Sequence, residues 1–439
     1  MNSPKVLIVG NHFDLKSGGG ITMTNLFKGW DKDKIAVVAY KIENPDFTIC
    51  ERYYQLGSLE CKQRFPYNFR MRGDGHKSGI ITETKPGLSS ISSVLIENPK
   101  PKNFYHKILQ STGIVDHYIP KLEVSNELLE WIREYSPEIL YTMLASLELI
   151  RFVDELRRKS GIPVAVHIMD DWPSTIASQQ KGPFKYFWHS TIEREFRKLL
   201  AKSTVKLSIS EAMSDEYLRR YGISFQPFHN PIDVKYWSAF SKTSYESSTV
   251  FTILYAGRIG TGLTTCLKDV AKAINNLIKK GYKIEFRIQS TTKSPFLDEL
   301  VSFGFVKLNP IAPYSELPKI FSQSDLLLMP NDFDAKSITF LKYSMPTKAS
   351  EYMVSGTPIL LYSSPETAVA MHAAKYNWAY VVSENDTGKL ETAIAGIYQN
   401  TGLRERLGNT ARDFAIRNYD DIIIRDLFRK SLIVEQELN

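Results

Sequence analysis

The alternation of buried-strand runs with helical segments is the feature that most constrains the fold of this chain. Strand-like runs occur in two series, the first at Lys5–Gly10, Ile35–Tyr40, Pro137–Met143, Ile162–Ile168 and Val205–Ser210, and the second at Val250–Ala256, Lys283–Gln289 and Asp325–Met329. Helical periodicity fills much of the sequence between these runs. Strands that alternate with helices predict a parallel sheet covered on both faces. The sequence therefore predicts an α/β architecture that occurs twice.

A polar, Ser-rich stretch at Tyr236–Thr249 separates the two series, and we interpret it as a linker between domains. We expect an N-terminal domain over residues 1–240, a C-terminal domain over residues 250–415, and a helix in residues 416–439 that packs back on the N-terminal domain. Both domains are expected to be doubly wound, with a ligand at the carboxyl ends of their strands, in a cleft between them. A chain of 439 residues is long enough for two or three such domains.

Residues 44–122 do not follow this alternation. The segment is rich in aromatic and basic side chains, among them Tyr53, Tyr54, Arg64, Phe65, Tyr67, Phe69, Arg70, Arg72 and Lys77. Long insertions without periodicity are usually functional or mobile. We predict an irregular insertion that faces the acceptor or an anionic membrane surface, although an ordinary surface loop could have the same composition.

The net charge and the cysteine content of the chain limit its expected binding partners and its expected cellular compartment. A formal net charge of +7 could favour anionic substrates, an anionic membrane surface or nucleic acid. No helix-turn-helix, zinc-finger or RNA-binding signature accompanies it, so we expect no nucleic-acid partner. Three cysteines without metal-type spacing favour a reducing, cytoplasmic location. The N-terminus enters a strand at once, so we expect no signal peptide.

The stretch Lys348–Leu361 indicates a binding site. It is predicted to be a helix that begins after Pro346, ends at Gly356 and runs into a buried strand. Its first turn carries both Lys348 and Glu351. Phosphate binds well at a helix N-terminus, and a carboxylate there can accept hydrogen bonds from sugar hydroxyls. Together these groups suit a nucleotide that carries a sugar.

Two further loops suit phosphate. Gly18, Gly19 and Gly20 lead into a helix and let a ligand approach the backbone, and a flexible turn is the weaker alternative. The dinucleotide fingerprint is absent there. Arg258 follows a predicted strand and offers a planar fork for phosphate oxygens, but a surface arginine after a glycine turn would need no function.

Several motifs occur in a characteristic order, namely Asp171-Trp172-Pro173, Ser210–Met213, His229–Asp233, Tyr255–Arg258, Ser324–Pro330, Lys348 to Pro358 and Leu403–Arg412. In this combination the chain resembles the retaining glycosyltransferases of family four, the group 1 transferases of the GT-B fold, of the type that builds bacterial surface polysaccharides. The resemblance covers most of the chain outside residues 44–122. It implies two Rossmann-like domains, contact of Arg258 with the donor diphosphate, and a hydrogen bond from Glu351 to the ribose. It also implies that His167 and Asp171 lie near the donor sugar or the reaction centre.

The sequence departs from the family at two positions. Tyr343 stands where the family often has a carboxylate that touches the donor sugar, with seven residues between it and Glu351. The lysine that usually follows Arg258 is missing, and Pro346-Thr347-Lys348 resembles a Pro-Ser-Lys element of some bacterial members. Our hypothesis is that Lys348 supplies the missing charge.

Asp332-Phe333-Asp334 matches a D-x-D metal motif that belongs to a different glycosyltransferase fold. Carboxylates can hold a divalent cation, but the surrounding sequence resembles the metal-independent fold. We therefore expect no catalytic metal. A solvated loop, or a contact from Asp334 to the donor sugar, are the alternatives.

The sequence thus predicts transfer of a sugar from a nucleotide-diphosphate sugar to a glycan or lipid-linked hydroxyl acceptor, with retention and without a cofactor. We assign catalytic roles to His167, Asp171, Arg258 and Lys348. Donor binding is assigned to Gly18, Gly19, Gly20, Arg258, Lys348 and Glu351. A nucleotide-sugar 2-epimerase of the same fold is one alternative. A non-catalytic sugar-nucleotide-binding protein is another, because Tyr343 replaces a carboxylate.

Overall fold

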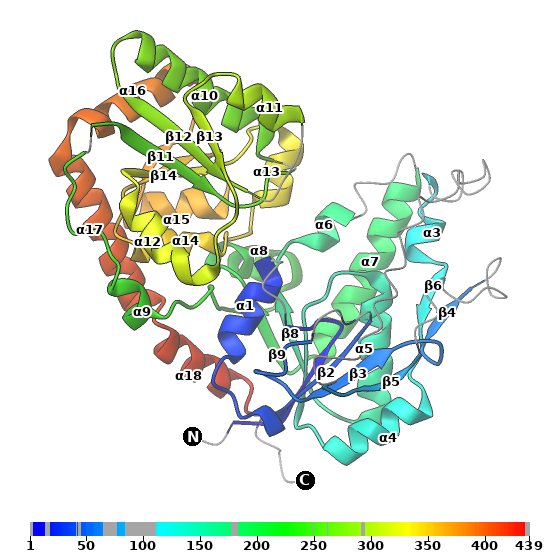
Figure 1. The fold of residues 1–439 in the computed structure, drawn as a ribbon. Coiled ribbons are helices and arrows are strands. Elements are labelled where there is room, and N and C mark those ends of the chain that lie inside the picture. Colours follow the sequence, from blue (N-terminus) through cyan, green and yellow to red (C-terminus); the bar gives the residue numbers. More distant parts are fainter. Residues whose placement is uncertain are drawn as a thin grey trace. The chain divides into compact units, whose positions relative to one another are not determined.

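The computed structural model describes residues 3–13, 18–40, 42, 45–64, 77–83, 111–176, 183–247, 249–260, 262–290 and 295–434. The chain forms two compact units (Figure 1). The first unit comprises Met1–Ile209, Ser214–Pro227 and Arg425–Asn439, and the second comprises Ser210–Met213 and Phe228–Ile424. Each is an α/β unit built on a mainly parallel sheet, as the alternation predicts.

The sheet of the first unit has eight strands in the order β10-β9-β8-β7-β1-β2-β3-β5. They are β1 Val6–Val9, β2 Ile35–Tyr40, β3 Arg52–Leu56, β5 Gly79–Ile81, β7 Ile139–Thr142, β8 Val164–Ile168, β9 Val205–Ser208 and β10 Gln226–Pro227. Every neighbouring pair is parallel except β3 and β5. The central strands are buried along their length, which explains their continuous apolar sequences.

Helices cover this sheet, and several begin at a capping side chain. They are α1 Gly18–Phe27, α3 Ile114–His117, α4 Asn126–Tyr135, α5 Leu147–Ser160, α6 Trp172–Ile176, α7 Pro183–Lys202 and α8 Glu211–Tyr221. The hydroxyl oxygens of Ser125 and Ser146 accept hydrogen bonds from backbone N–H groups in the first turns of α4 and α5. The helical periodicity between the predicted strands Ile162–Ile168 and Val205–Ser210 is confirmed by α7.

Part of the segment 44–122 belongs to the core rather than to an irregular insertion. The aromatic rings of Tyr53 and Tyr54 are buried because β3 pairs with β2 in the main sheet. Strands β4 (Cys61–Gln63) and β6 (Pro120–Leu122) form a separate antiparallel ribbon. Buried Glu60 accepts hydrogen bonds from the hydroxyls of Tyr54, Ser78 and Ser125. Phe65, Tyr67, Phe69, Arg70 and Arg72, on which the membrane-facing prediction also rests, lie outside the described residues.

The sheet of the second unit has six parallel strands in the order β13-β12-β11-β14-β15-β16. They are β11 Phe251–Ala256, β12 Ile284–Gln289, β13 Val306–Asn309, β14 Leu326–Pro330, β15 Ile359–Tyr362 and β16 Tyr380–Val382. This is the Rossmann strand order, in which the winding direction reverses between the first and fourth strands. Ligands of such sheets bind outside the carboxyl ends of the strands at that point, which here lies between β11 and β14.

The helices of the second unit connect these strands and close the unit. They are α9 Val234–Ser238, α10 Thr264–Lys279, α11 Pro295–Val301, α12 Leu317–Gln323, α13 Ala335–Leu341, α14 Lys348–Val354, α15 Ala368–Tyr376, α16 Thr387–Gln399 and α17 Thr401–Asn418. The stretch that we interpret as a linker packs on this unit, because buried Lys242 donates to the main-chain oxygens of Ser322 and Ser324. Among the described residues, no helix combines the length and the apolar character needed to cross a membrane.

The last helix, α18 (Asp421–Ser431), attaches the end of the chain to the first unit. Phe428 is fully buried, and its ring centroid lies 5.1 Å from that of Phe27 and 5.9 Å from that of Tyr141. Arg425 Nε donates to the main-chain oxygen of Asn25 at 2.7 Å. Apolar burial and hydrogen bonding therefore both fix the second half of α18.

We predict that Phe428→Ala destabilises the first unit by about 3–5 kcal/mol, because it removes a large buried ring and leaves a cavity. Chemical denaturation followed by a probe in the first unit would measure this loss. Ile422→Ala is the matched control, since Ile422 is 75% exposed on the same helix, and it should change stability by less than about 0.5 kcal/mol. Equal effects of the two variants would contradict the prediction.

Candidate functional site

The candidate site of the second unit begins at the carboxyl end of β11, beside the reversal point of the sheet. Gly257 follows β11 with a φ of +148°, a conformation that side-chain-bearing residues rarely adopt. The next residue, Arg258, is exposed, and its guanidinium forms no ion pair with the described residues. The Tyr255 hydroxyl donates to the main-chain oxygen of Arg258 at 2.7 Å, which fixes the turn.

Lys348 reaches the same place from the first turn of α14. Its Nζ donates to the main-chain oxygen of Ala256 at 3.3 Å and lies 4.2 Å from the ring centroid of Tyr255. A Cβ atom at Gly257 would lie only 3.1 Å from this Nζ, so the glycine leaves room for the ammonium group. The structure thus brings the Lys348 ammonium next to the residue that precedes Arg258. A joint role of Arg258 and Lys348 at a diphosphate stays a prediction.

Glu351 lies three residues after Lys348, in the same first turn of α14, and is 7% exposed. Burial raises the pKa of Glu351 to about 7, although a hydrogen bond from the Tyr314 hydroxyl opposes the rise. Burial likewise lowers the pKa of Lys348 to about 8. Desolvation therefore moves an acid and a base in one helix turn toward neutral pH, a combination that is common at functional sites.

Contacts from other elements hold α14 in place. The Tyr352 hydroxyl accepts a hydrogen bond from the backbone N–H of Ala256 at 2.9 Å, which ties the helix to β11. Asn230 Nδ2 donates to the main-chain oxygen of Thr347 at 3.2 Å. Gly356, with a φ of +70°, ends the helical segment as the sequence predicts. Lys348 and Glu351 are consequently presented by a fixed backbone.

Tyr343 is half-buried between α13 and α14, and its main-chain oxygen accepts a hydrogen bond from Ser210 Oγ at 2.7 Å. A phenol at this position cannot carry the charge of the carboxylate that the family often has. The residues that sequence reasoning missed are Tyr314 and Tyr255. Helix α12, strand β14 and helix α13 lie between Tyr314 and Glu351 in the sequence, so only the folded chain reveals the contact.

The predicted catalytic residue His167 belongs to the first unit and is fully buried on β8. Its Nδ1 lies 2.7 Å from the Tyr141 hydroxyl, and the ring of Phe428 packs nearby. Burial lowers the pKa of His167 to about 3, against a smaller opposing effect of a backbone hydrogen bond at Ser208. The imidazole is therefore neutral at physiological pH and has no exposed surface, and its catalytic role stays a prediction.

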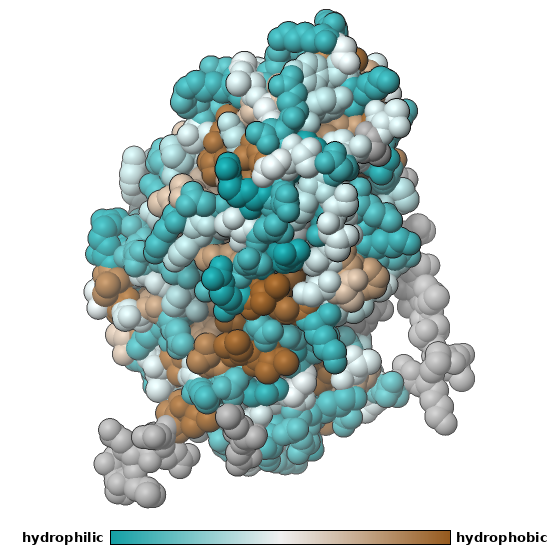
Figure 2. Space-filling model, turned by 90° about the vertical axis from the view of Figure 1, so that its left-hand side faces the viewer, coloured by the Kyte–Doolittle hydropathy of each residue, from teal (hydrophilic) through white to brown (hydrophobic). Residues whose placement is uncertain are grey.

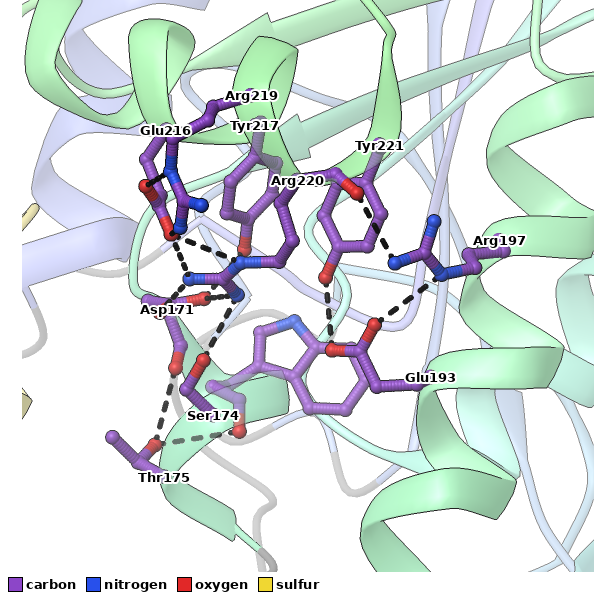
Figure 3. Close-up of polar contacts among 11 residues, drawn as sticks. Asp171, Ser174, Thr175, Glu193, Arg197, Glu216, Tyr217, Arg219, Arg220 and Tyr221 are labelled. Carbon is purple, nitrogen blue, oxygen red and sulfur yellow. Dashed lines mark hydrogen bonds and ion pairs between the residues drawn. The ribbon is translucent and has the colours of Figure 1, made fainter.

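Asp171, the second residue predicted for the first unit, is the centre of a polar network (Figure 3). Its carboxylate accepts two hydrogen bonds from the guanidinium of Arg220, both at 3.0 Å, and one from the Tyr217 hydroxyl at 2.9 Å. Glu216 accepts from the other side of the same guanidinium. This pairing ties α6 to α8, and a direct role of Asp171 in catalysis stays a prediction.

The glycines of the first loop lie at the N-terminus of α1, at the carboxyl end of β1. A Cβ atom at Gly19 would meet the side chains of Met143 and Met169 at 3.8 and 3.9 Å. Those methionines follow β7 and β8, so Gly18, Gly19 and Gly20 lie at the carboxyl edge of the first sheet. Ser17, which precedes them, lies outside the described residues. Their role in donor binding stays a prediction.

The two aspartates of the D-x-D motif act as helix caps. Asp332 is buried and accepts hydrogen bonds from the backbone N–H groups of Thr264 and Cys266, in the first turn of α10. Asp334 accepts from the backbone N–H groups of Lys336 and Ser337 at the start of α13. Both carboxylates are thus engaged by helix N-termini, which explains the motif without a metal.

One group of side chains in the second unit has the composition of a metal site. Ligand atoms of Glu211, His229 and His372 lie within 4.8 Å of one another. However, Trp378 Nε1 donates to His372 Nδ1 at 2.8 Å, so the proton of this neutral imidazole is on Nε2. His229 Nε2 lies 2.7 Å from Glu211 Oε2. The two histidines thus have separate hydrogen-bond partners, and a cation would have to displace the tryptophan contact to bind His372.

The strand order and the structural matches given below together show that the chain has the GT-B fold, which consists of two Rossmann-like units. Solved structures match it over nearly the whole length. HepE from Anabaena, solved with UDP-glucose, has a TM-score of 0.60 at 11% identity and covers 98% of this chain and 99% of its own. A glycosyltransferase from Rickettsia africae has a TM-score of 0.60 at 12% identity over 98% of this chain and 99% of that one.

A third similar structure is sucrose-phosphate synthase from Thermosynechococcus elongatus, with a TM-score of 0.59 at 11% identity over 97% of this chain and 98% of its own. No protein-family model matches the sequence. No curated protein matches it in sequence either. At these identities the likeness establishes the fold, and the function has to be argued from the site.

The buried neutral imidazole of His167 predicts a specific acid sensitivity. The pKa in the folded state, about 3, is below the ordinary value of 6.5, so the unfolded chain binds the proton first. Stability from this residue is full above pH 6.5 and is lost as the pH falls toward 3. Between pH 7 and pH 5 we expect a loss of about 1–2 kcal/mol.

Unfolding of the wild type and of His167→Gln over this pH range would measure the effect. Glutamine can still accept the Tyr141 hydrogen bond but does not titrate, so its stability should depend less steeply on pH. Exposed His189 provides the control, because His189→Gln should leave the slope unchanged. Parallel profiles of His167→Gln and the wild type would refute the assignment.

Proposed function

We propose that this chain is a glycosyltransferase that moves a sugar from a nucleotide-diphosphate sugar to a hydroxyl acceptor with retention of configuration. The observation that carries the proposal is the position of the Lys348 ammonium at the carboxyl end of β11, on the main-chain oxygen of Ala256 and beside the turn that leads to Arg258, with Glu351 buried in the same helix turn. Two cations suit a diphosphate, and a buried carboxylate suits ribose hydroxyls. Structures of the same fold support it, including HepE, which was solved with UDP-glucose.

In the proposed reaction the bond between the sugar C1 and the diphosphate oxygen breaks, and a bond from C1 to the acceptor oxygen forms on the same face. The acceptor proton passes to an oxygen of the leaving diphosphate. Arg258 and the Lys348 ammonium stabilise the negative charge that develops on that group, which is the main contribution of the protein. The proposed reaction includes no divalent metal, and the carboxylates of Asp332 and Asp334 already accept hydrogen bonds at helix N-termini.

The acceptor is proposed to be a glycan or a lipid-linked oligosaccharide in the cytoplasm or at an inner membrane face. Neither the nucleotide base nor the sugar is specified by the site. Position 343 holds tyrosine where the family often has a carboxylate. We expect this difference to change recognition of the donor sugar rather than binding of the diphosphate, because Tyr343 lies in the loop between α13 and α14, outside the segments that carry Lys348 and Arg258.

A panel of nucleoside diphosphates and their sugars, screened by thermal shift, tests the proposal first. A ligand bound only to the folded state raises the melting temperature by mass action. Stabilising donors would then be incubated with acceptors, with and without EDTA, and the anomeric configuration of the product determined by NMR. We expect transfer with retention that EDTA does not abolish.

Each other outcome of this experiment counts against a specific part of the proposal. The absence of stabilisation by every nucleotide would refute the donor site. Conversion of the donor without acceptor would indicate an epimerase, and binding without turnover would indicate a non-catalytic protein. Loss of turnover in EDTA would contradict metal independence.

Replacement of Lys348 by methionine should weaken binding of a nucleoside diphosphate about tenfold or more, since a hydrogen bond from a charged donor is lost. Wild-type affinity should also fall as the pH rises above about 8, where free Lys348 loses its proton, and the variant should lack this fall. Lys307→Met, on the exposed strand β13, is the control. Calorimetric titration would measure both effects, and unchanged affinity in Lys348→Met would eliminate the role.

A further inference from the structure

Helix α7 of the first unit presents an exposed surface that combines aromatic and cationic side chains. At its N-terminal end Tyr186 is 74% and Phe187 59% exposed, although both are large and partly apolar. The opposite face is buried through Trp188, Ile192 and Phe196. The exposed aromatic rings are therefore not a consequence of a poorly packed helix, because α7 is anchored along its other side.

The aromatic and cationic side chains lie on the same face. Phe187, Ser190, Arg194 and Arg197 follow the spacing i, i+3, i+7 and i+10, which places them in one line along the helix. All charged side chains of α7 that are fully exposed are cationic, namely Lys185, Arg194, Arg197, Lys198 and Lys202. The two glutamates of the helix are half-buried and pair with these cations.

The cationic end of this line opens onto a pocket of about 700 Å³ between α6, α7 and α8. Ser174, His189, Ser190, Glu193, Arg194, Arg197 and Arg220 line it. Arg220 is already neutralised by Asp171 and Glu216 (Figure 3). Arg194, by contrast, uses one of its five N–H donors, on Glu195, and the rest are available to an anion.

We propose that this face of α7 docks the protein on an anionic phospholipid surface. Aromatic rings prefer the headgroup layer of a bilayer, and helices that lie in that layer carry lysine and arginine beside their aromatic side chains. Tyr186 and Phe187 enter the interface, and Arg194 and Arg197 bind lipid phosphates. The inference does not depend on the proposed transferase activity, because it concerns only adsorption to a surface.

A soluble protein partner would be less well matched to this face. The exposed charges of α7 are all of one sign, which complements a surface of many phosphates rather than a mixed protein surface.

Helix α18 offers a comparison surface, because its apolar stripe of Ile422, Ile423 and Leu427 lacks aromatic rings. Figure 2 faces the side of the molecule that carries α18 and shows apolar patches there, which makes that helix a useful control surface.

Co-sedimentation of the full-length protein with vesicles tests the proposal. The wild type should bind vesicles that contain phosphatidylglycerol at low salt, bind pure phosphatidylcholine vesicles much less, and be released at high salt. Because a basic residue near an anionic surface contributes roughly fivefold, Arg194→Gln with Arg197→Gln should weaken binding about tenfold or more. Tyr186→Ser with Phe187→Ser should also weaken it, whereas the single substitution Phe187→Trp, which keeps an aromatic ring, should bind as the wild type does.

The control replaces Ile422 and Ile423 of α18 by serine, which removes exposed apolar surface elsewhere, and it should change vesicle binding less than twofold. Thermal unfolding would confirm that the exposed α7 substitutions leave the fold intact. Failure of the wild type to bind anionic vesicles at low salt would overturn the proposal. So would binding by both α7 double variants that equals that of the wild type.

Discussion

The position of the Lys348 ammonium is the constraint on which the candidate site depends. It lies between the ring of Tyr255 and the main-chain oxygen of Ala256, and no described carboxylate lies within ion-pair distance of it. A cation withdrawn from water without a full counter-charge is costly, and the pKa of Lys348 is lowered accordingly. A bound diphosphate would supply the missing charge. Glycine suits position 257, because its φ of +148° is rare for other residues and a Cβ atom there would make a tight contact of 3.1 Å with the ammonium.

Two other carboxylates that the sequence analysis singles out already have hydrogen-bond partners, which distinguishes them from this cluster. Asp332 is engaged by the N-terminus of α10, and Asp171 is held by Arg220. Groups with complete sets of partners stabilise a fold but gain little from a ligand. What remains available for one is the exposed guanidinium of Arg258, the Lys348 ammonium and the Glu351 carboxylate, and this contrast favours a diphosphate-binding role for the β11 end.

The sequence predicts much of the fold, because strands buried on both faces are continuous apolar runs that stand out. It predicts the α14 turn equally well, since proline and glycine mark its ends. Strand β13 was missed because it is half-exposed and has no apolar run. Helix α5 was also missed, although its apolar periodicity and the Ser146 cap are readable. The burial of His167 could not be predicted, because Phe428, from the far end of the chain, closes its environment.

The same limit applies to α7, whose amphipathic pattern does not reveal by itself which cations the fold encloses and which it leaves exposed. In the folded first unit, Arg220 is enclosed by two carboxylates, whereas Arg194 and Arg197 lie at the surface and touch half-buried glutamates. Salt weakens the interactions of enclosed charges only slightly. It largely screens the interactions of exposed charges with groups more than about 10 Å away at moderate ionic strength. The attraction of α7 for an anionic surface is therefore salt-dependent, while the aromatic rings contribute an apolar component that salt does not weaken. Reversible adsorption, rather than permanent anchoring, is the behaviour that this division of roles produces.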